Sequence, residues 1–155
     1  MTTPRLIIRI QPEPFDAAAE IEALSRMGDD VGAVTSFTGY CRSEGGRLAA
    51  LELEHYPGMA EEEIASVVVE ASTRWSLLGA TVIHRHGKMV PGDGIVLVAT
   101  ASSHRTASFD AAHFIMDYLK TRAPFWKKEH RADGTSGDWV EAKAVDDALA
   151  ERWKA

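Results

Sequence analysis

The sequence predicts an α+β fold in a single domain whose sheet is mostly antiparallel. Segments with strand-like alternation and segments with helical spacing follow one another throughout the chain. Turns rich in glycine and proline join several strands directly, which favours hairpins over βαβ crossovers. Of the 155 residues, 45% are hydrophobic, enough for one core, and no repeat or linker divides residues 1–155.

In the first half of the chain, alternating or β-branched residues predict strands, and apolar residues at helical spacing predict helices. Strands are expected at residues 5–11, 31–40 and 48–56. Helices are expected at residues 15–26 and from Pro57-Gly58 to residue 78. A polar, glycine-containing loop at residues 43–47 separates the second and third strands.

The second half predicts two hairpins and two further helices. A strand at residues 80–90 and another at residues 95–102 are joined by the turn sequence PGDG, which predicts the first hairpin. A helix follows at residues 106–121. The second hairpin is expected between residues 124–131 and 138–143, and a short helix at residues 146–153 closes the chain.

Composition argues against several classes of protein. A formal net charge of −6 and a pI near 5.5 disfavour broad nucleic-acid binding, which needs a basic surface. No apolar run approaches the ~20 residues that span a bilayer, and the first residues lack an export signal. The single cysteine, Cys41, rules out an internal disulfide and fits a reducing compartment. A cytoplasmic protein is therefore expected, without membrane or nucleic-acid partners.

The most informative segment is KTRAPFWKKEHR, residues 120–131. It holds five basic residues and one acidic residue, with Pro124, Phe125 and Trp126 between the cations. Proline and two aromatic rings favour a fixed, partly dry setting in which a lysine can act on an anion. The alternative is a basic strand edge that discourages aggregation, and on this segment alone the strand edge is the commoner explanation.

Two further groups of residues suit an anion. Residues 102–106, SSHRT, lie where a strand gives way to a helix, so free backbone N–H groups, His104 and Arg105 are expected to attract anions there. Arg42 follows a predicted strand and is suited to bidentate phosphate binding. Because both groups follow a strand end, we expect Arg42, His104 and Arg105 to converge on one anion.

The cysteine and the histidines give weaker signals. Cys41 beside Arg42 suggests a thiolate nucleophile, but a small buried residue is the commoner role of a lone cysteine. His84 and His86 alternate on one strand and are suited in principle to a metal ion. No cluster of cysteines or carboxylates completes such a site in the sequence, so a metal site is not expected.

Several long segments carry a family resemblance. These are LELEHYPGMAE, VPGDGIVLVA, SSHR, FIMDYLKTRAPFWKKE and WVEAK, found in this order at residues 51–61, 90–99, 102–105, 114–129 and 139–143. From about residue 6 to residue 153 the chain resembles the large, catalytic subunit of molybdopterin synthase. The segment around Pro124 is long and rich in rare residue types, which makes this resemblance far more specific than any short motif.

The resemblance implies a sulfurtransferase in molybdenum cofactor biosynthesis. Its family converts cyclic pyranopterin monophosphate, called precursor Z, into molybdopterin by installing a dithiolene. The sulfur arrives as a thiocarboxylate on the C-terminal Gly-Gly of a small ubiquitin-like subunit, and no cofactor is expected. The resemblance also implies an α/β-hammerhead-like fold and a homodimer within a heterotetramer.

The family's functional residues match positions in this sequence. Lys120 and Lys127 are the expected catalytic residues, and mutual repulsion of their ammonium groups is expected to lower at least one pKa. The expected substrate-binding residues are Tyr40, Cys41, Arg42, His104, Arg105, Lys128 and Glu129. The sequence departs from the usual family pattern at His86, Lys88 and the ADGTSG turn, which concerns local loop structure.

The partner's thin Gly-Gly tail is expected to run toward the two lysines through a narrow channel. Its apolar walls are predicted to include Phe37, Met116 and Phe125. Two other functions stay open: a non-catalytic adaptor that docks a Gly-Gly tail, and an enzyme that acts on another phosphorylated metabolite. The presence of both Lys120 and Lys127 argues against the adaptor, and the absence of a nucleotide-binding motif argues against the second enzyme.

Overall fold

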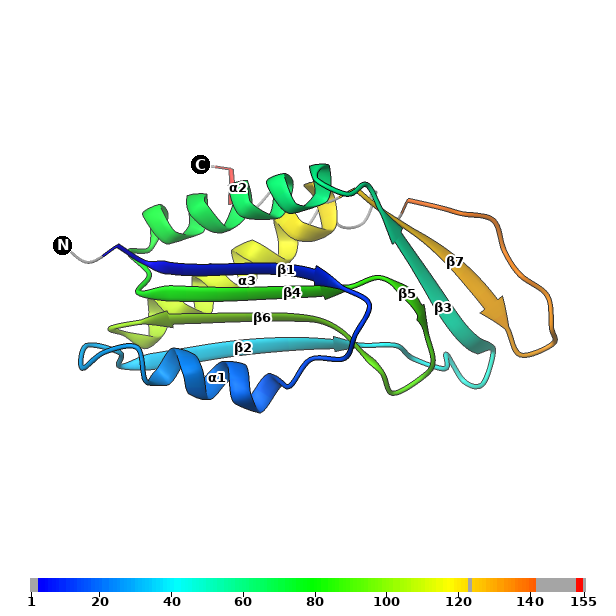
Figure 1. The fold of residues 1–155 in the computed structure, drawn as a ribbon, viewed down its shortest axis with the longest axis horizontal. Coiled ribbons are helices and arrows are strands. Elements are labelled where there is room, and N and C mark those ends of the chain that lie inside the picture. The colour runs from blue at the N-terminus through cyan, green and yellow to red at the C-terminus, as the bar shows by residue number, and fades with distance from the viewer. Residues whose placement is uncertain (1–2, 123, 142–152, 155) are drawn as a thin grey trace.

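The computed structural model describes residues 3–122, 124–141 and 153–154. Within these residues the chain forms three helices and seven strands (Figure 1). In chain order they are β1 (Arg5–Gln11), α1 (Ala17–Ser25), β2 (Ala33–Tyr40), β3 (Leu48–His55), α2 (Met59–Arg74), β4 (Gly79–Arg85), β5 (Gly87–Met89), β6 (Gly94–Ser102), α3 (Arg105–Arg122) and β7 (Phe125–Arg131). The predicted α+β class is confirmed.

Four strands form the first sheet, in the order β1-β4-β6-β2. The β1–β4 pair is parallel, and the β4–β6 and β6–β2 pairs are antiparallel. Helices α2 and α3 pack on one face of this sheet, and α1 packs on the other (Figure 1). Both faces are therefore covered, which explains why every residue of β4 is buried.

The main core lies between the first sheet and the helices α2 and α3. Val96 and Val98 of β6 face this side and belong to one apolar cluster with Phe114 and Ile115 of α3. The alternate β6 residues Ala99 and Ala101 pack instead with Leu24 of α1 in a smaller cluster. The period of two along β6 thus supplies both faces of the sheet. Each large buried side chain contributes about 1.5–3 kcal/mol.

The helices begin where the sequence provides capping groups. Asp16 caps α1 by accepting a hydrogen bond from the backbone N–H of Ala19, at 3.1 Å. At the start of α2, the Glu61 carboxylate accepts from the backbone N–H of Gly58, at 3.2 Å. Gly58 has a φ of 85°, in the left-handed region that favours glycine. Among the described residues, no helix is long and apolar enough to cross a membrane.

Three strands form the second sheet, in the order β5-β3-β7, and both of its pairings are antiparallel. It lies beyond one end of the first sheet, next to the ends of β1, β2 and β4 (Figure 1). In contrast to β4, every residue of β7 is half-buried. We call the place where the ends of β2, β4 and α3 meet the second sheet the junction.

The predicted strand at residues 80–90 is two strands. Its first part, β4, pairs with β6 from Gly79–Ala101 to His84–Val96, as the hairpin prediction required. The chain then turns at Gly87, whose φ is 94°, and β5 pairs with β3 instead. The single-strand prediction was wrong because alternation continues across Gly87, although the backbone there leaves the first sheet.

The predicted second hairpin is only partly correct. The main partner of β7 is β3, a strand about 75 residues earlier in the chain, and not residues 138–143. The segment after Arg131 does run back beside β7, as the hairpin prediction required, through the isolated antiparallel bridges Lys127–Val140 and His130–Ser136. The rest of that predicted strand and most of the predicted helix at residues 146–153 lie outside the described residues. Trp153 is described, and its indole packs against Trp75 and Phe114.

Candidate active site

The two candidate catalytic lysines both belong to the junction. Lys120 lies in the last turn of α3, and its side chain is exposed. Because α3 returns alongside β6, its C-terminal end lies near the start of β6 and hence near the second sheet (Figure 1). Strand β7 begins at Phe125, directly after this helix, and carries Lys127. The chain reversal near Pro124 was predicted from sequence, and it brings both lysines to the same end of the molecule.

The alternation of β7 separates residues that the sequence presents as one segment. Side chains two residues apart on a strand share a face, so Lys127 shares its face with Phe125 and Glu129. Lys128 is on the opposite face, where its Nζ lies 5.9 Å from the ring centre of Trp139. The structure therefore places Lys128 away from the face that carries Lys127.

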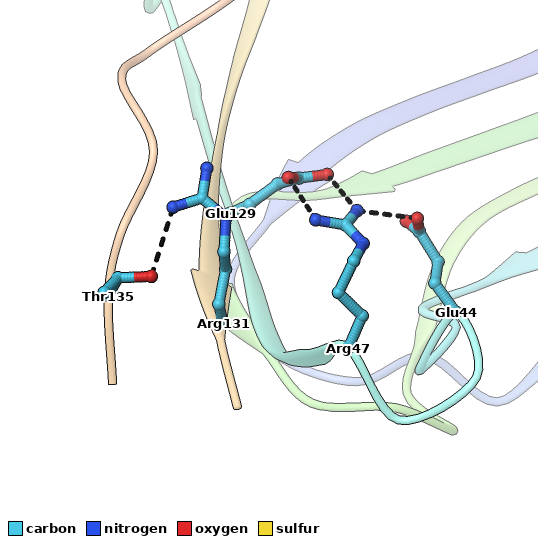
Figure 2. Close-up of polar contacts among 5 residues, drawn as sticks. All are labelled: Glu44, Arg47, Glu129, Arg131 and Thr135. Carbon is cyan, nitrogen blue, oxygen red and sulfur yellow. Dashed lines mark hydrogen bonds and ion pairs between the residues drawn. The ribbon is translucent and has the colours of Figure 1, made fainter. Parts of the chain in front are cut away.

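Glu129 makes an ion pair within the protein. Its two carboxylate oxygens accept hydrogen bonds from Arg47, at 3.2 and 3.1 Å, and Arg47 also bonds to Glu44 at 2.7 Å (Figure 2). Hydrogen bonding to Arg47 holds the pKa of Glu129 below its ordinary value. The pair joins β7 to the polar loop at residues 43–47, whose own hydrogen bonds include Leu48 N–H to the Ser43 carbonyl oxygen at 2.9 Å. Glu129 thus has a structural role in this arrangement.

Tyr40 is the last residue of β2, and Cys41 and Arg42 follow it at the junction. Cys41 is buried, whereas Tyr40 and Arg42 are exposed. The backbone N–H of Cys41 donates to Asp93, and its carbonyl oxygen accepts from Gly92, both at 2.9 Å. Burial raises the pKa of the Cys41 thiol, which disfavours a thiolate. The prediction that Cys41 is a small buried residue is confirmed. Its backbone N–H and carbonyl groups both bond to the turn at Gly92 and Asp93, so Cys41 supports the loop that carries Arg42.

His104 and Arg105 lie at the other end of the molecule, and the predicted convergence with Arg42 in one subunit was wrong. His104 follows β6 and Arg42 follows β2, but these strands are antiparallel, with Ala33 opposite Ser102 and Tyr40 opposite Gly94. Their C-terminal ends therefore point in opposite directions. Because a strand rises ~3.3 Å per residue, the length of β2 separates Arg42 from His104 and Arg105 by roughly 25 Å.

A groove lies between the edge strand β2 and the helix α3 and extends along α3 from Phe109 to Lys120. Its volume is about 580 Å³, and it is lined by Thr35, Ser36, Phe37, Phe109, Asp110, Ala112, His113, Met116, Asp117 and Lys120. Phe37 and Phe109 are 45% and 62% exposed, which is high for phenylalanine. Phe37 and Met116 line this groove together with Lys120, as predicted, but Phe125 does not.

Phe125 instead belongs to a group of stacked rings at the junction. The ring of His84 stacks on it at 3.9 Å with an interplanar angle of 18°, and the centre of the His55 ring lies 6.0 Å from that of Phe125. His86 in turn lies 4.6 Å from His55. We call these four residues the ring stack. Sequence reasoning missed it because its members come from three separate segments, and no local pattern links them.

Among the described residues, no group of three or more His, Cys, Asp or Glu side chains is arranged to hold a metal ion. His84, proposed in principle as half of a metal pair with His86, is buried and its Nδ1 lies 2.9 Å from the carbonyl oxygen of Arg85. The site therefore offers cationic side chains beside a groove, together with the buried imidazole of His84. Such groups suit the binding of an anion and the transfer of protons.

Comparison with known proteins identifies the family. The model of the MoaE protein family matches residues 10–122, which include every candidate site residue up to the end of α3. The chain belongs to the MoaE family. The molybdopterin synthase catalytic subunit of Mesorhizobium japonicum is 64% identical over 148 residues, 96% of this chain and 93% of that protein. That of Rhizobium meliloti is 62% identical over 146 residues, 94% of each chain.

The fold agrees with a solved member of the MoaE family. The molybdopterin biosynthesis MoaE protein of Burkholderia ambifaria superposes with a TM-score of 0.84 at 45% identity, covering 97% of this chain and 99% of the other. The resemblance to the catalytic subunits of molybdopterin synthase is thus confirmed over nearly the whole chain.

Proposed function

We propose that this chain is the catalytic subunit of a molybdopterin synthase, in molybdenum cofactor biosynthesis. It would convert precursor Z into molybdopterin, with sulfur from the C-terminal thiocarboxylate of a small ubiquitin-like subunit. The observation that carries this proposal is the 64% identity with a molybdopterin synthase catalytic subunit over 96% of the chain. A cytoplasmic location, favoured by the lone cysteine, is part of the proposal.

The chemistry of the junction supports a sulfur donor from outside this chain. The thiol of Cys41 is buried, and burial raises its pKa, so it is a poor nucleophile. Lys120, Lys127 and Arg42 lie at the same end of the molecule and are suited to an anionic pterin phosphate. In this proposal Lys120 and Lys127 orient the substrate and the partner's thiocarboxylate and transfer protons between them.

The groove along α3 suits the partner's tail. It ends at Lys120, and Phe37 and Met116 supply apolar wall. A Gly-Gly tail has no side chains, so it fits a narrow space and is recognised mainly through its backbone. A bulky substitution such as Ser36→Trp in the wall is expected to block sulfur transfer without unfolding the protein, because Ser36 is exposed.

A second copy of the chain accounts for His104 and Arg105. In a two-fold symmetric pair the same surface meets itself, so two antiparallel α3 helices would place the N-terminal end of one beside the C-terminal end of the other. His104 and Arg105 of one copy would then lie near Lys120 of its partner. This arrangement would give each homodimer two composite sites and would cover the exposed Phe109 and Phe37.

Reconstitution is the direct test of the proposed function. The purified chain, a thiocarboxylated small subunit and precursor Z are combined, and dithiolene formation is followed by mass spectrometry. We expect molybdopterin to form only with all three components. Binding of the small subunit without any product would favour the adaptor function, and turnover of other phosphorylated metabolites alone would favour the second alternative.

Mixed dimers test the composite site. Two inactive variants, Lys120→Ala and His104→Ala, are co-expressed with different tags, and the heterodimer is isolated. If the site is shared, one of its two sites carries both substitutions and the other carries none, so about half of the wild-type activity returns. If each subunit works alone, the heterodimer stays as inactive as its parents.

A further inference from the structure

The ring stack connects three strands of the fold, and one of its members, Phe125, lies between the two candidate catalytic lysines in the chain. His84 comes from β4 in the first sheet, His55 from β3 and Phe125 from β7 in the second sheet. Phe125 is the first residue of β7, five residues after Lys120 and two residues before Lys127. Whatever holds Phe125 therefore determines where β7 begins relative to the end of α3.

His84 is suited to hold Phe125 because its ring is fixed and uncharged. Its Nδ1 lies 2.9 Å from the carbonyl oxygen of Arg85, and since a carbonyl oxygen only accepts, Nδ1 carries the hydrogen. Burial lowers the pKa of His84 to about 3, with smaller contributions from the charges of Lys120, His55 and His86. Near neutral pH the ring therefore packs on Phe125 as a neutral aromatic group.

Burial also acts on His55, the second histidine that lies near Phe125. Burial, and then the nearby His86, lower the pKa of His55, while Glu61 and Glu54 act in the opposite direction. The Glu61 carboxylate lies near this ring, with 3.9 Å between its Oε1 and Nε2 of His55. The ammonium group of Lys120 is close enough to contribute to the lowered pKa of His84, which places the stack next to one of the two lysines.

We propose that His84 is a positioning residue: its ring, stacked on Phe125, fixes the start of β7 and thereby the position of Lys127 relative to Lys120. The two lysines sit on a helix and a strand that meet at the junction, and the stack is the packed contact that ties that strand to β4 of the first sheet. The effect of this positioning on catalysis rests on the proposed function. The effect of His84 on the position of Lys127 does not depend on that function.

Three variants test the role of the ring. His84→Phe keeps an aromatic ring in the stack, and His84→Leu is apolar but has no ring. Phe125→Leu removes the other ring. We expect His84→Leu and Phe125→Leu to lower kcat for dithiolene formation about 10²-fold with little change in KM, because a misplacement of about 1 Å has this effect. His84→Phe should stay within about threefold of the wild type.

The double variant and a distant control complete the kinetic test. If the two rings act as one unit, His84→Leu with Phe125→Leu should lower kcat no more than either change alone. Trp75→Leu removes an aromatic ring from the main core at the far end of α2 and should lower Tm while leaving kcat unchanged. Normal turnover by folded His84→Leu, or equal losses in His84→Phe and His84→Leu, would overturn the proposal.

A second measurement needs no turnover. Lysines are dimethylated with ¹³C, and the signals of Lys120 and Lys127 are assigned through Lys→Arg variants. We expect both signals to shift in His84→Leu and Phe125→Leu and to stay in place in His84→Phe. If the wild type makes no molybdopterin, the proposed function fails while this measurement still decides the inference. Unshifted signals in both leucine variants would overturn the positioning role.

Discussion

The two sheets of this protein differ in what they bury. In the first sheet every residue of β4 is buried, because helices cover both faces. In the second sheet every residue of β7 is half-buried, and the strand carries Lys127, Lys128 and Glu129. The first sheet therefore supplies most of the apolar core, and the second presents charged groups to solvent and ligands. The first sheet thus contributes most to stability and the second carries most of the charged candidate site residues. The candidate active site lies where the two sheets meet.

The largest expected effect is a loss of catalytic rate without a loss of stability when a lysine of the junction is replaced. Lys120→Ala should lower the rate of dithiolene formation by about 10²–10⁴-fold, and Lys127→Ala should impair it strongly, because positioned proton transfer is lost. The Tm of both variants should match the wild type. The rate is measured with saturating thiocarboxylated partner.

Lys88→Ala is the matched control for the lysines. Lys88 is an exposed lysine of β5, in the same second sheet, and should matter little. Lys143, a lysine of the WVEAK segment that lies outside the expected catalytic residues, would be the other natural control, but it is not among the described residues. Near-wild-type turnover by Lys120→Ala would refute its catalytic role, and a loss in Lys88→Ala as large as in Lys127→Ala would show a general charge effect.

The second prediction concerns the cores of the two sheets. Leu97 of β6 is fully buried, so Leu97→Ala should lower the free energy of unfolding by about 2–5 kcal/mol. Leu51 of β3 is only half-buried, and Leu51→Ala should have a smaller effect. Urea denaturation measures both. An equal loss in the two variants would contradict the assignment of stability to the first sheet.

The third prediction uses pH at the boundary between the sheets. The pKa of His84 is about 3 when folded and 6.5 when unfolded, so below pH 6.5 the unfolded chain binds more protons. Stability from the neutral ring is thus complete above pH 6.5 and falls by up to about 1.4 kcal/mol per pH unit below it. His84→Phe should flatten the stability curve between pH 6.5 and 5. An unchanged slope would show that His84 is not buried as a neutral ring.

The smallest effect is expected within the second sheet. Removing the guanidinium in Arg47→Ala should raise the pKa of Glu129 toward its ordinary value, because Arg47 is its principal partner. A ¹³C NMR titration of the glutamate carboxyl groups measures this change. Arg131→Ala removes a weaker influence on the same carboxylate and should shift its pKa less. A pKa of Glu129 that stays low without Arg47 would contradict the ion pair shown in Figure 2.

Sequence predicted most of the first sheet and its helices. Strands β1, β2 and β6 and helix α3 lie within one or two residues of the predicted bounds, because burial on one or two faces leaves a clear apolar pattern. The second sheet was predicted less well. Its β3–β7 pairing joins segments far apart in the chain, and the half-buried pattern of β7 carries no signal for its partner.

The sequence predicted which residues belong to the candidate site, but it did not predict how they are arranged in space. The family resemblance gave Lys120, Lys127 and Arg42, and these do lie at one end of the molecule. It also gave His104, but strand direction decides which strand ends meet, and local sequence does not contain that direction. For the same reason the contact between His84 and Phe125, which are 41 residues apart, had no precursor in the sequence pattern.

The alternation of β7 has a consequence for how the chain can change length. Loss or gain of one residue between Lys120 and Lys127 would turn the strand over, so that Lys127 would take the face now held by Trp126 and Lys128. A single-codon deletion there would bring the ammonium group of Lys127 to the position now held by the Trp126 ring, although neither side chain would itself be substituted. Natural variation in length is therefore expected to collect in the turn at residues 132–137, beyond the end of β7, where a change of one residue leaves the lysines in place.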